Sequence, residues 1–309
     1  MMQNQGMDGK VCLVTGANNG MGFETAKKLT ALGAHVVMVC RSRERGEAAR
    51  QRIARETGHL PDLLLADLSL QREIKRVAAE YRAQYERLDV LVNVAGFAFN
   101  TREVTDEGFE RTFALNYLGY FSLTLELVDL LVSSAPARVV NITSEAHRWS
   151  DIAFDNLQGE KSFPKRRMPP LPLMYGWTNM YRIMFTYELA DRLAAKGVSA
   201  NCLCPGFVAV SRSSHGRFTN GLTKVLGFLL RATTAAKAAE TIVYLASSPE
   251  AAELTGAYYE SGKLARSAPQ SYDKAVRTRL WSETLRLTGY ENGTQMTQIA
   301  QIDADFNDL

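Results

Sequence analysis

The sequence has few cysteines and no metal-binding spacing among them. Only four of the 309 residues are cysteine, and Cys202-Leu-Cys204 has the wrong spacing for a CxxC redox or zinc motif. Cys12, Cys40 and Cys202 lie in apolar, strand-like runs, and Cys204 lies at the end of one. We therefore expect buried, reduced thiols, no metal site and a reducing compartment, which favours the cytoplasm.

The sequence also lacks a strong charge of one sign and any long apolar run. A net charge of +3, without an aromatic-basic tract, gives no support for a nucleic-acid partner. The opening residues MMQNQGMDGK are polar, and no run approaches the ~20 apolar residues of a transmembrane helix. We expect a soluble protein with neither signal peptide nor membrane anchor.

Short β-branched runs alternate with longer helical patterns along the chain. We predict strands over 10–16, 35–40, 63–67, 88–96, 137–144, 197–206 and 256–261, and helices over 21–33, 43–57, 70–86, 104–134, 175–196 and 235–248. Several strands are apolar throughout, as in a sheet covered on both faces. The alternation predicts an α/β fold with a doubly wound, Rossmann-type parallel sheet in three layers. We assign 1–290 to a single domain and 291–309 to a flexible C-terminal tail.

The first predicted strand runs into a glycine-rich turn, TGANNGMG. Gly16, Gly20 and Gly22 would let the backbone approach a pyrophosphate, and the following helix would supply free N–H groups and the positive end of its dipole. Packing alone can also require such glycines. The strand–turn–helix context favours the nucleotide-binding interpretation.

The end of the second strand lacks the acidic residue that would hold the ribose of NAD(H). The segment reads CRSRER, with Arg41 near that position and Arg43 close behind. The planar fork of arginine suits a 2′-phosphate, although a solvated basic turn has the same sequence. We predict NADP(H) rather than NAD(H).

Further motifs follow in an order that resembles the short-chain dehydrogenase/reductase superfamily, and within it the retinol dehydrogenase-like branch, over about residues 8–290. TGANNGMG resembles the TGxxxGxG turn, NVAG the NNAG stretch, and ADLS places Asp67 and Leu68 where the family contacts adenine. The segments 154–161, 204–208 and 261–289 resemble that branch as well. The resemblance implies cofactor contacts at Thr15, Gly16, Asn18, Gly20, Met21, Gly22, Arg41, Asp67, Leu68, Asn93, Ala95, Gly96, Asn179, Pro205, Gly206 and Val208.

The resemblance also implies a mechanism and an assembly. Tyr175 would donate or accept the proton, Ser144 would hydrogen-bond the substrate oxygen, and Asn116 would hold a backbone and water relay. A hydride would pass between the nicotinamide and the carbinol carbon. Family members form homodimers or homotetramers, so the same is expected here.

The family motif Tyr-x-x-x-Lys lacks its lysine, because the chain reads Tyr175-Gly-Trp-Thr-Asn179. Asn179 can still hydrogen-bond ribose hydroxyls, but it carries no charge that would favour a phenolate. A protonated Tyr175 can donate to a carbonyl oxygen and is a poor base, so we predict a bias towards reduction. Arg182 shares this helix face and leans towards Asn179. It is either a substitute cation or, as we favour, a surface or rim arginine.

The substrate side of the predicted site is apolar. Residues 207–232 occupy the family's mobile substrate loop, and 150–173 form another wall. Trp149 and Trp177 line the pocket or simply pack, and His147 is expected to be structural. We predict reduction or oxidation of a bulky hydrophobic ketone, aldehyde or alcohol, as in a carbonyl reductase of specialised metabolism. A non-redox cyclase, isomerase or dehydratase, and a cofactor-binding pseudoenzyme, remain as alternatives.

Overall fold

One mostly parallel sheet forms the centre of the molecule. The computed structural model describes residues 6–161, 163, 172–208 and 233–290. Its strands are β1 (Val11–Thr15), β2 (His35–Cys40), β3 (Asp62–Leu65), β4 (Val90–Asn93), β5 (Ala137–Ile142), β6 (Val198–Cys204), β7 (Tyr258–Glu260) and β8 (Lys263–Ala265). They are arranged in the order β3-β2-β1-β4-β5-β6-β7-β8, and only the β7–β8 pair is antiparallel. The order reverses between β1 and β4, where ligands bind in doubly wound sheets.

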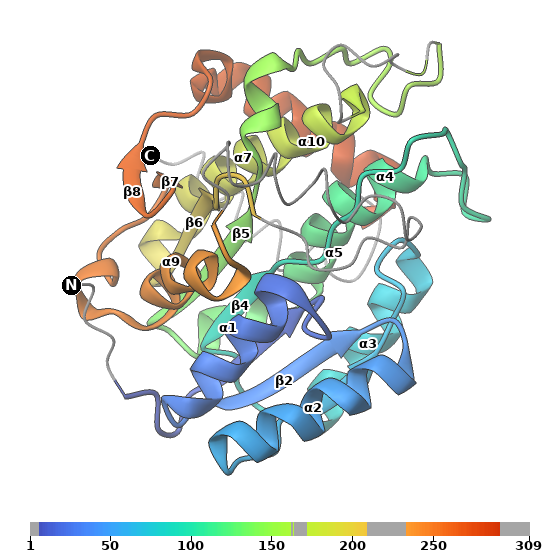
Figure 1. Cartoon of the computed structure of the whole chain (residues 1–309). Coiled ribbons are helices and arrows are strands. Elements are labelled where there is room, and N and C mark those ends of the chain that lie inside the picture. Colours follow the sequence, from blue (N-terminus) through green and yellow to red (C-terminus); the bar gives the residue numbers. More distant parts are fainter. Residues whose placement is uncertain (1–5, 162, 164–171, 209–232, 291–309) are drawn as a thin grey trace.

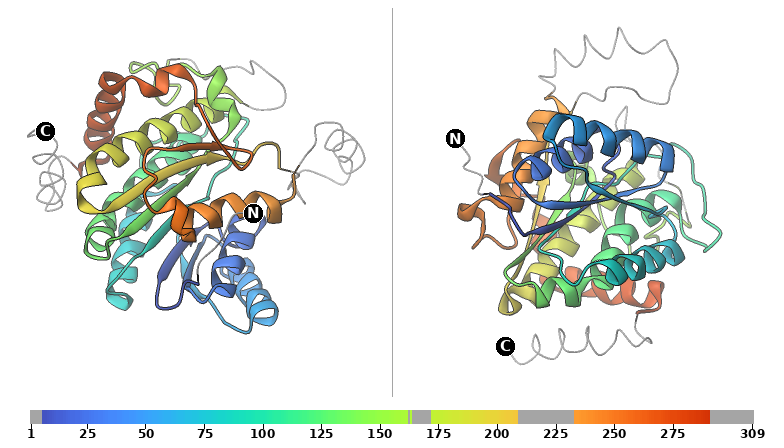
Figure 2. Two further views of the ribbon diagram at one scale, coloured as in Figure 1. Left: turned by 90° about the vertical axis from the view of Figure 1, so that its left-hand side faces the viewer. Right: turned by 90° about the horizontal axis from the view of Figure 1, so that it is seen from below.

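Helices cover both faces of the sheet, as predicted (Figures 1 and 2). They are α1 (Gly20–Ala31), α2 (Arg43–Thr57), α3 (Gln71–Gln84), α4 (Arg111–Phe113), α5 (Gly119–Glu126), α6 (Val128–Ser133), α7 (Leu173–Leu193), α9 (Ala235–Ser247) and α10 (Lys274–Thr288). Short 3₁₀ turns include η2 (Glu145–Trp149), and a π turn, η1 (Ala114–Leu118), joins α4 to α5. None of these described helices is both long and apolar enough to cross a membrane.

Alternating strand residues build a separate core on each face. In β1, Cys12 and Val14 join a cluster that includes residues of α1, α2 and α9, whereas Leu13 joins a cluster with α3, α5 and α7. Successive side chains of a strand point to opposite faces, so a strand buried on both faces must be apolar throughout. The predicted three-layer arrangement follows from this pattern.

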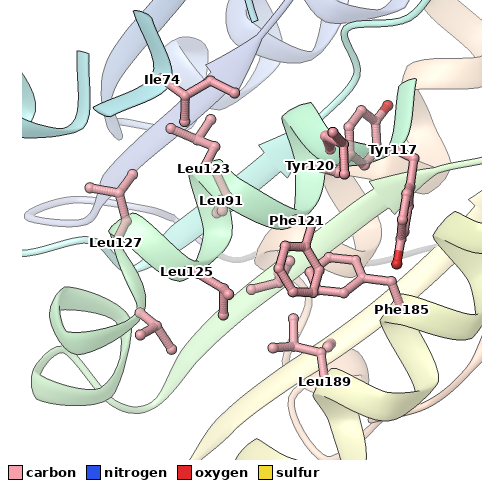
Figure 3. Packing of buried hydrophobic residues seen from close by; sticks show 14 of the residues in the cluster. Ile74, Leu91, Tyr117, Tyr120, Phe121, Leu123, Leu125, Leu127, Phe185 and Leu189 are labelled. Atoms are coloured by element: carbon pink, nitrogen blue, oxygen red, sulfur yellow. The ribbon is translucent and has the colours of Figure 1, made fainter. Parts of the chain in front are cut away.

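Aromatic side chains hold α5 and α7 together on one face. Figure 3 shows Phe121 of α5 beside Phe185 of α7, with ring centroids 5.3 Å apart. Trp281 of α10 closes the group, lying 5.1 Å from Phe121 and 6.0 Å from Phe185. Tertiary packing of this kind fixes the helices that carry Asn116 and Tyr175 relative to each other.

The structure corrects three secondary-structure predictions. The helix predicted over 104–134 begins only at Arg111 and is interrupted by the π turn and at Leu127; Gly108, at φ +85°, lies in a turn before it. Strand β8 was not predicted, although Ser261 and Gly262, at φ +49° and +82°, make the two-residue turn of a β-hairpin. Helix α10 was not predicted either.

Candidate active site

The glycine-rich turn leaves no room for side chains where β1 meets α1. A Cβ on Gly22 would lie 2.4 Å from the Gly16 carbonyl oxygen, and one on Gly16 would lie 3.0 Å from the Ala95 Cα atom. Gly16 and Gly20 also have positive φ values, of +65° and +57°. A backbone cradle at a helix N-terminus fits a pyrophosphate. Asn18 and Met21 are half-buried in the same turn.

Two buried polar residues join neighbouring strand ends behind this turn. Thr15 accepts hydrogen bonds through its hydroxyl oxygen from the N–H groups of Val94 and Ala95, at 2.9 and 3.1 Å. Asn93 donates to the side-chain oxygen of Asn141 at 2.9 Å. Both Thr15 and Asn93 are therefore engaged in fixing strand ends, and any direct contact with the cofactor stays a prediction.

Arg41 lies at the end of β2 with its guanidinium exposed. Its side chain is 54% exposed, and Nη1 lies 3.7 Å from the Asp67 carboxylate. The Asp67 carboxylate also accepts from the N–H and hydroxyl of Ser69, at 3.0 and 2.6 Å. An exposed ion pair at this distance binds Arg41 weakly, so the guanidinium is free to reach a phosphate. Leu68, next to Asp67, is buried.

Asn116 lies in the π turn and pins the loop that follows β4. Its amide donates to the Phe97 carbonyl and accepts from the Phe97 N–H, both at 2.9 Å. Gly96 lies against this contact, since a Cβ there would lie 3.2 Å from the Asn116 side-chain oxygen. π turns occur often at functional sites. Here the π turn places Asn116 beside the loop that follows β4.

A glycine lets the segments of Ser144 and Tyr175 approach each other. Ser144 caps η2 by accepting from the Ala146 N–H at 3.3 Å, and Tyr175 lies in the first turn of α7. A Cβ on Gly176 would lie 2.8 Å from the Ala146 carbonyl oxygen. Both Ser144 and Tyr175 are half-buried. The structure thus brings the two predicted catalytic segments into contact.

The favoured prediction for Arg182, a surface or rim arginine, is wrong. The residue is 3% exposed. Its guanidinium donates to the backbone carbonyls of Asn116, Ile142 (3.1 Å) and Ala95 (3.4 Å), and to the side-chain oxygen of Asn179 at 3.2 Å. The side chain leans back along α7 towards Asn179, because side chains in a helix tilt towards its N-terminus. There it meets the carbonyls at the carboxyl ends of β4 and β5.

Arg182 also lies over an aromatic ring. Its guanidinium carbon is 4.1 Å from the ring centroid of Tyr120, a cation–π contact. Burial raises the pKa of Tyr120 to about 12, Arg182 opposes that rise, and a negative charge on Tyr175 adds to it. Tyr120 is therefore within electrostatic reach of both Arg182 and Tyr175. The Tyr120 hydroxyl has no hydrogen-bond partner among the described residues.

Asn179 is fully buried and joins Tyr175 to Arg182. Its amide nitrogen donates to the Tyr175 backbone carbonyl at 2.7 Å, and its oxygen accepts from Arg182. These contacts use one N–H of the amide. The second N–H has no partner among the described residues, and its predicted role with the ribose stays a prediction.

His147 has the structural role that the sequence predicted. Its Nδ1 lies 2.8 Å from the Ser144 carbonyl oxygen, and its Nε2 accepts from the Ala268 N–H at 3.1 Å. These partners require a neutral ring protonated on Nδ1. Burial lowers the pKa of His147 and so favours the neutral ring. The hydrogen bond from this ring holds the Ser144 carbonyl in place.

The remaining predicted residues lie at the end of β6. Gly206 has a φ of +75°, and a Cβ there would lie 2.8 Å from the Ser261 hydroxyl. Pro205 is half-buried, and Val208 pairs with Thr233. Of the predicted substrate loop, 207–232, residues 209–232 lie outside the described residues, as does the predicted tail at 291–309.

Exposed aromatic side chains follow three neighbouring strands. Phe97 (45% exposed), Trp149 (43%) and Phe207 (51%) come after β4, β5 and β6. The carboxyl ends of parallel strands meet at one edge of the sheet, so these rings lie at the edge that carries the site. Trp177, by contrast, packs against the core.

Several site residues were not predicted from the sequence. Asn141 donates to Thr186 at 3.0 Å and accepts from Asn93, which ties β4, β5 and α7 together. Gly176 and Tyr120 were missed as well. Polar residues inside otherwise apolar strands, such as Asn93 and Asn141, were the available signal. In the described part of the chain, no group of three or more metal-ligand side chains is present.

Comparisons with known proteins agree with this geometry. The family described as short chain dehydrogenase matches residues 10–154. Retinol dehydrogenase 13 of Homo sapiens is 37% identical over 291 residues, covering 92% of this chain and 86% of the relative. The Pseudomonas aeruginosa RhlG/NADP active-site complex is 25% identical with a TM-score of 0.67, covering 83% of this chain and 96% of that one. L-Sorbose reductase from Gluconobacter frateurii, complexed with NADPH and L-sorbose, shares the fold at 20% identity and a TM-score of 0.69, covering 84% and 97%.

Proposed function

This chain belongs to the short-chain dehydrogenase/reductase family, in its retinol dehydrogenase-like branch, and from that premise we propose that it reduces a bulky hydrophobic ketone or aldehyde with NADPH. The family makes it an oxidoreductase that uses a nicotinamide cofactor. The observation that carries the proposal is the contact between the segments of Ser144 and Tyr175. Assembly into a homodimer or homotetramer stays a prediction.

The preference for NADPH rests on Arg41. An exposed guanidinium at the end of β2, held only by a long contact to Asp67, is placed for a 2′-phosphate. The carboxylate of Asp67 is already engaged with Ser69. Solved structures with the same fold include complexes with NADPH and with NADP.

The residues of this chain supply the proton and the hydrogen bonds. When bound, NADPH supplies the hydride to the carbonyl carbon. The Tyr175 hydroxyl donates its proton to the carbonyl oxygen, and the Ser144 hydroxyl donates a hydrogen bond to the same oxygen. The carbonyl becomes an alcohol, and Tyr175 must regain one proton before the next turnover.

The substrate class rests on the exposed aromatic rings at the site edge. Phe97, Trp149 and Phe207 expose large apolar surfaces after neighbouring strands. Small-molecule sites are lined mostly by apolar and aromatic side chains with a few polar groups. A bulky apolar carbonyl compound would cover these rings and reach the two hydroxyls.

The test is NADPH oxidation by purified protein against a panel of bulky apolar aldehydes and ketones. We expect turnover by the wild type, loss of it in Tyr175→Phe and Ser144→Ala, and unchanged NADPH affinity in both. We also expect reduction to be faster than alcohol oxidation at pH 7, because Tyr175 acts as an acid. Efficient oxidation at that pH would contradict the direction. Tight NADPH binding with no turnover would favour a non-redox enzyme or a cofactor-binding pseudoenzyme. These alternatives rest on Asn179, the amide that stands in place of the motif's lysine.

A further inference from the structure

Arg182 places a buried positive charge at the centre of the site. It is 3% exposed, and among the described residues no carboxylate lies within ion-pair distance of it. Its hydrogen-bond acceptors are three backbone carbonyls and the Asn179 side-chain oxygen, and its guanidinium lies over the Tyr120 ring. A buried charge without a counter-ion is costly for a fold.

The Asn179 side chain is oriented by this charge. Its oxygen faces Arg182 Nη1 at 3.2 Å, so its nitrogen faces the Tyr175 carbonyl at 2.7 Å. A lysine at 179 would remove this acceptor and add an ammonium group, which can only donate. Arg182 would then lose one acceptor and have a second cation nearby. Positions 179 and 182 can therefore hold one cation between them.

We propose that Arg182 supplies, from one turn further along α7, the cation that the family motif places at position 179. The proposal rests on the function proposed above. Arg182 is a positioning residue: it holds Tyr175 through Asn179, and it holds the Asn116 carbonyl directly. Its charge stabilises the negative charge left on Tyr175 after proton donation. Because a guanidinium keeps its proton, it acts as a fixed charge and takes no part in a proton relay.

The test moves the cation between the two positions. The variants are Arg182→Lys, Arg182→Met, Asn179→Lys and the double variant Asn179→Lys/Arg182→Met. We expect Arg182→Met to lower kcat roughly 10²-fold, as for the loss of one preorganised donor, with Arg182→Lys retaining part of it. The double variant should regain activity that neither single variant shows.

The split between kcat and KM separates a charge effect from a structural one. The charge of Arg182 is used only once Tyr175 has given up its proton, so Arg182→Met should lower kcat for reduction and leave KM for the carbonyl compound nearly unchanged. Arg192→Met is the matched control, because Arg192 is a buried arginine of the same helix that is paired with Glu188 at 2.7 Å. It should lower stability and leave kcat in place. An unchanged kcat in Arg182→Met would overturn the proposal.

Thermal unfolding of the cofactor-free protein gives a readout that does not need turnover. We expect Asn179→Lys to lower the Tm of the wild type and to raise that of Arg182→Met. If Asn179→Lys is as stable as the wild type, two cations fit and the proposal is wrong. If the wild type reduces no carbonyl on the panel, the proposed function fails, while the unfolding comparison still decides whether the two positions share one cation.

Discussion

Replacing Gly176 by alanine should separate the two segments that carry the reacting hydroxyls. An ideal Cβ at 176 would lie 2.5 Å from the Ser150 hydroxyl and 2.8 Å from the Ala146 carbonyl oxygen. Ordinary contacts begin at 3.4 Å. The serine hydroxyl can rotate away, but the carbonyl is backbone, so η2 must move by about 0.6 Å to restore an ordinary contact. Ser144, which caps η2, moves with it.

The expected magnitudes follow from two opposing terms. Overpacking costs about 1–3 kcal/mol, and alanine gains about 1 kcal/mol over glycine within a helix. The net loss in the free energy of unfolding should therefore be about 0–2 kcal/mol. Catalysis is more sensitive, because a 1 Å misplacement can cost ~10²-fold in rate. We expect kcat for carbonyl reduction to fall by about 10- to 100-fold, with NADPH affinity unchanged.

Gly46→Ala is the matched control for this prediction. Gly46 lies within α2, and a Cβ there would lie 2.8 Å from a methyl group of Leu63 and 3.2 Å from the Cys40 Cβ, so alanine overpacks this position as well. Stability should fall by a similar amount, and kcat should not change. The assay is steady-state NADPH oxidation together with chemical denaturation of each variant. A Gly176→Ala protein with wild-type kcat would refute the view that this contact positions Ser144.

Three further predictions concern cofactor choice, acid stability and thiol reactivity. Arg41→Ala should weaken NADPH binding roughly tenfold and leave NADH binding unchanged, as measured by fluorescence titration; equal losses for both would argue against a 2′-phosphate contact. Burial lowers the pKa of His147 in the folded protein, so the unfolded chain binds the proton more tightly. Stability should be full above the ordinary value of about 6.5 and fall below it, and His147→Asn should flatten this dependence in denaturation curves measured at several pH values. Burial raises the pKa of Cys40 to about 12, and that of the other three cysteines also lies above its ordinary value; a thiol reagent should therefore modify them only after unfolding, and labelling of the native protein would contradict this.

Elements with local signals at both ends were predicted well. Helix α2 was predicted over 43–57 and spans Arg43–Thr57. Ser42 caps its start by accepting from the Arg45 N–H at 3.3 Å, and Gly58 ends it with a φ of +80°. Both signals are readable from residue type alone. The buried strands were found for a similar reason, since parallel strands covered on both faces are apolar runs between turns.

The helix predicted over 104–134 failed because its limits depend on distant contacts. The π turn lies where Asn116 grips Phe97, a contact across 19 residues. Phe121 of α5 packs on Phe185 and Trp281, from helices far along the chain. Hydrophobic periodicity reports that a segment is helical and gives no information on where tertiary contacts widen or break it.

The residues of the candidate site also fall into those set by local patterns and those set by distant contacts. The glycine-rich turn, Arg41 and the Tyr175 segment are local patterns at strand ends and helix starts, so the sequence places them. The burial of Arg182 depends on carbonyl oxygens from three separate segments, those of Ala95, Asn116 and Ile142, which converge only in the folded chain.

The spacing of Tyr175, Asn179 and Arg182 gave the correct helix face but the wrong environment for the arginine. A lone arginine is usually exposed, and that base expectation outweighed the geometry. The three carbonyls explain why Arg182 is buried instead. Each supplies an acceptor, and together they offset part of the cost of burying the guanidinium. An amide at position 179 then suits the arginine, since its oxygen accepts a hydrogen bond at 3.2 Å, whereas a lysine there could only donate. The missing lysine and the buried arginine are therefore one feature of this site: with Arg182 in place, a second cation at 179 would repel it, and with Asn179 in place, the arginine has its fourth acceptor.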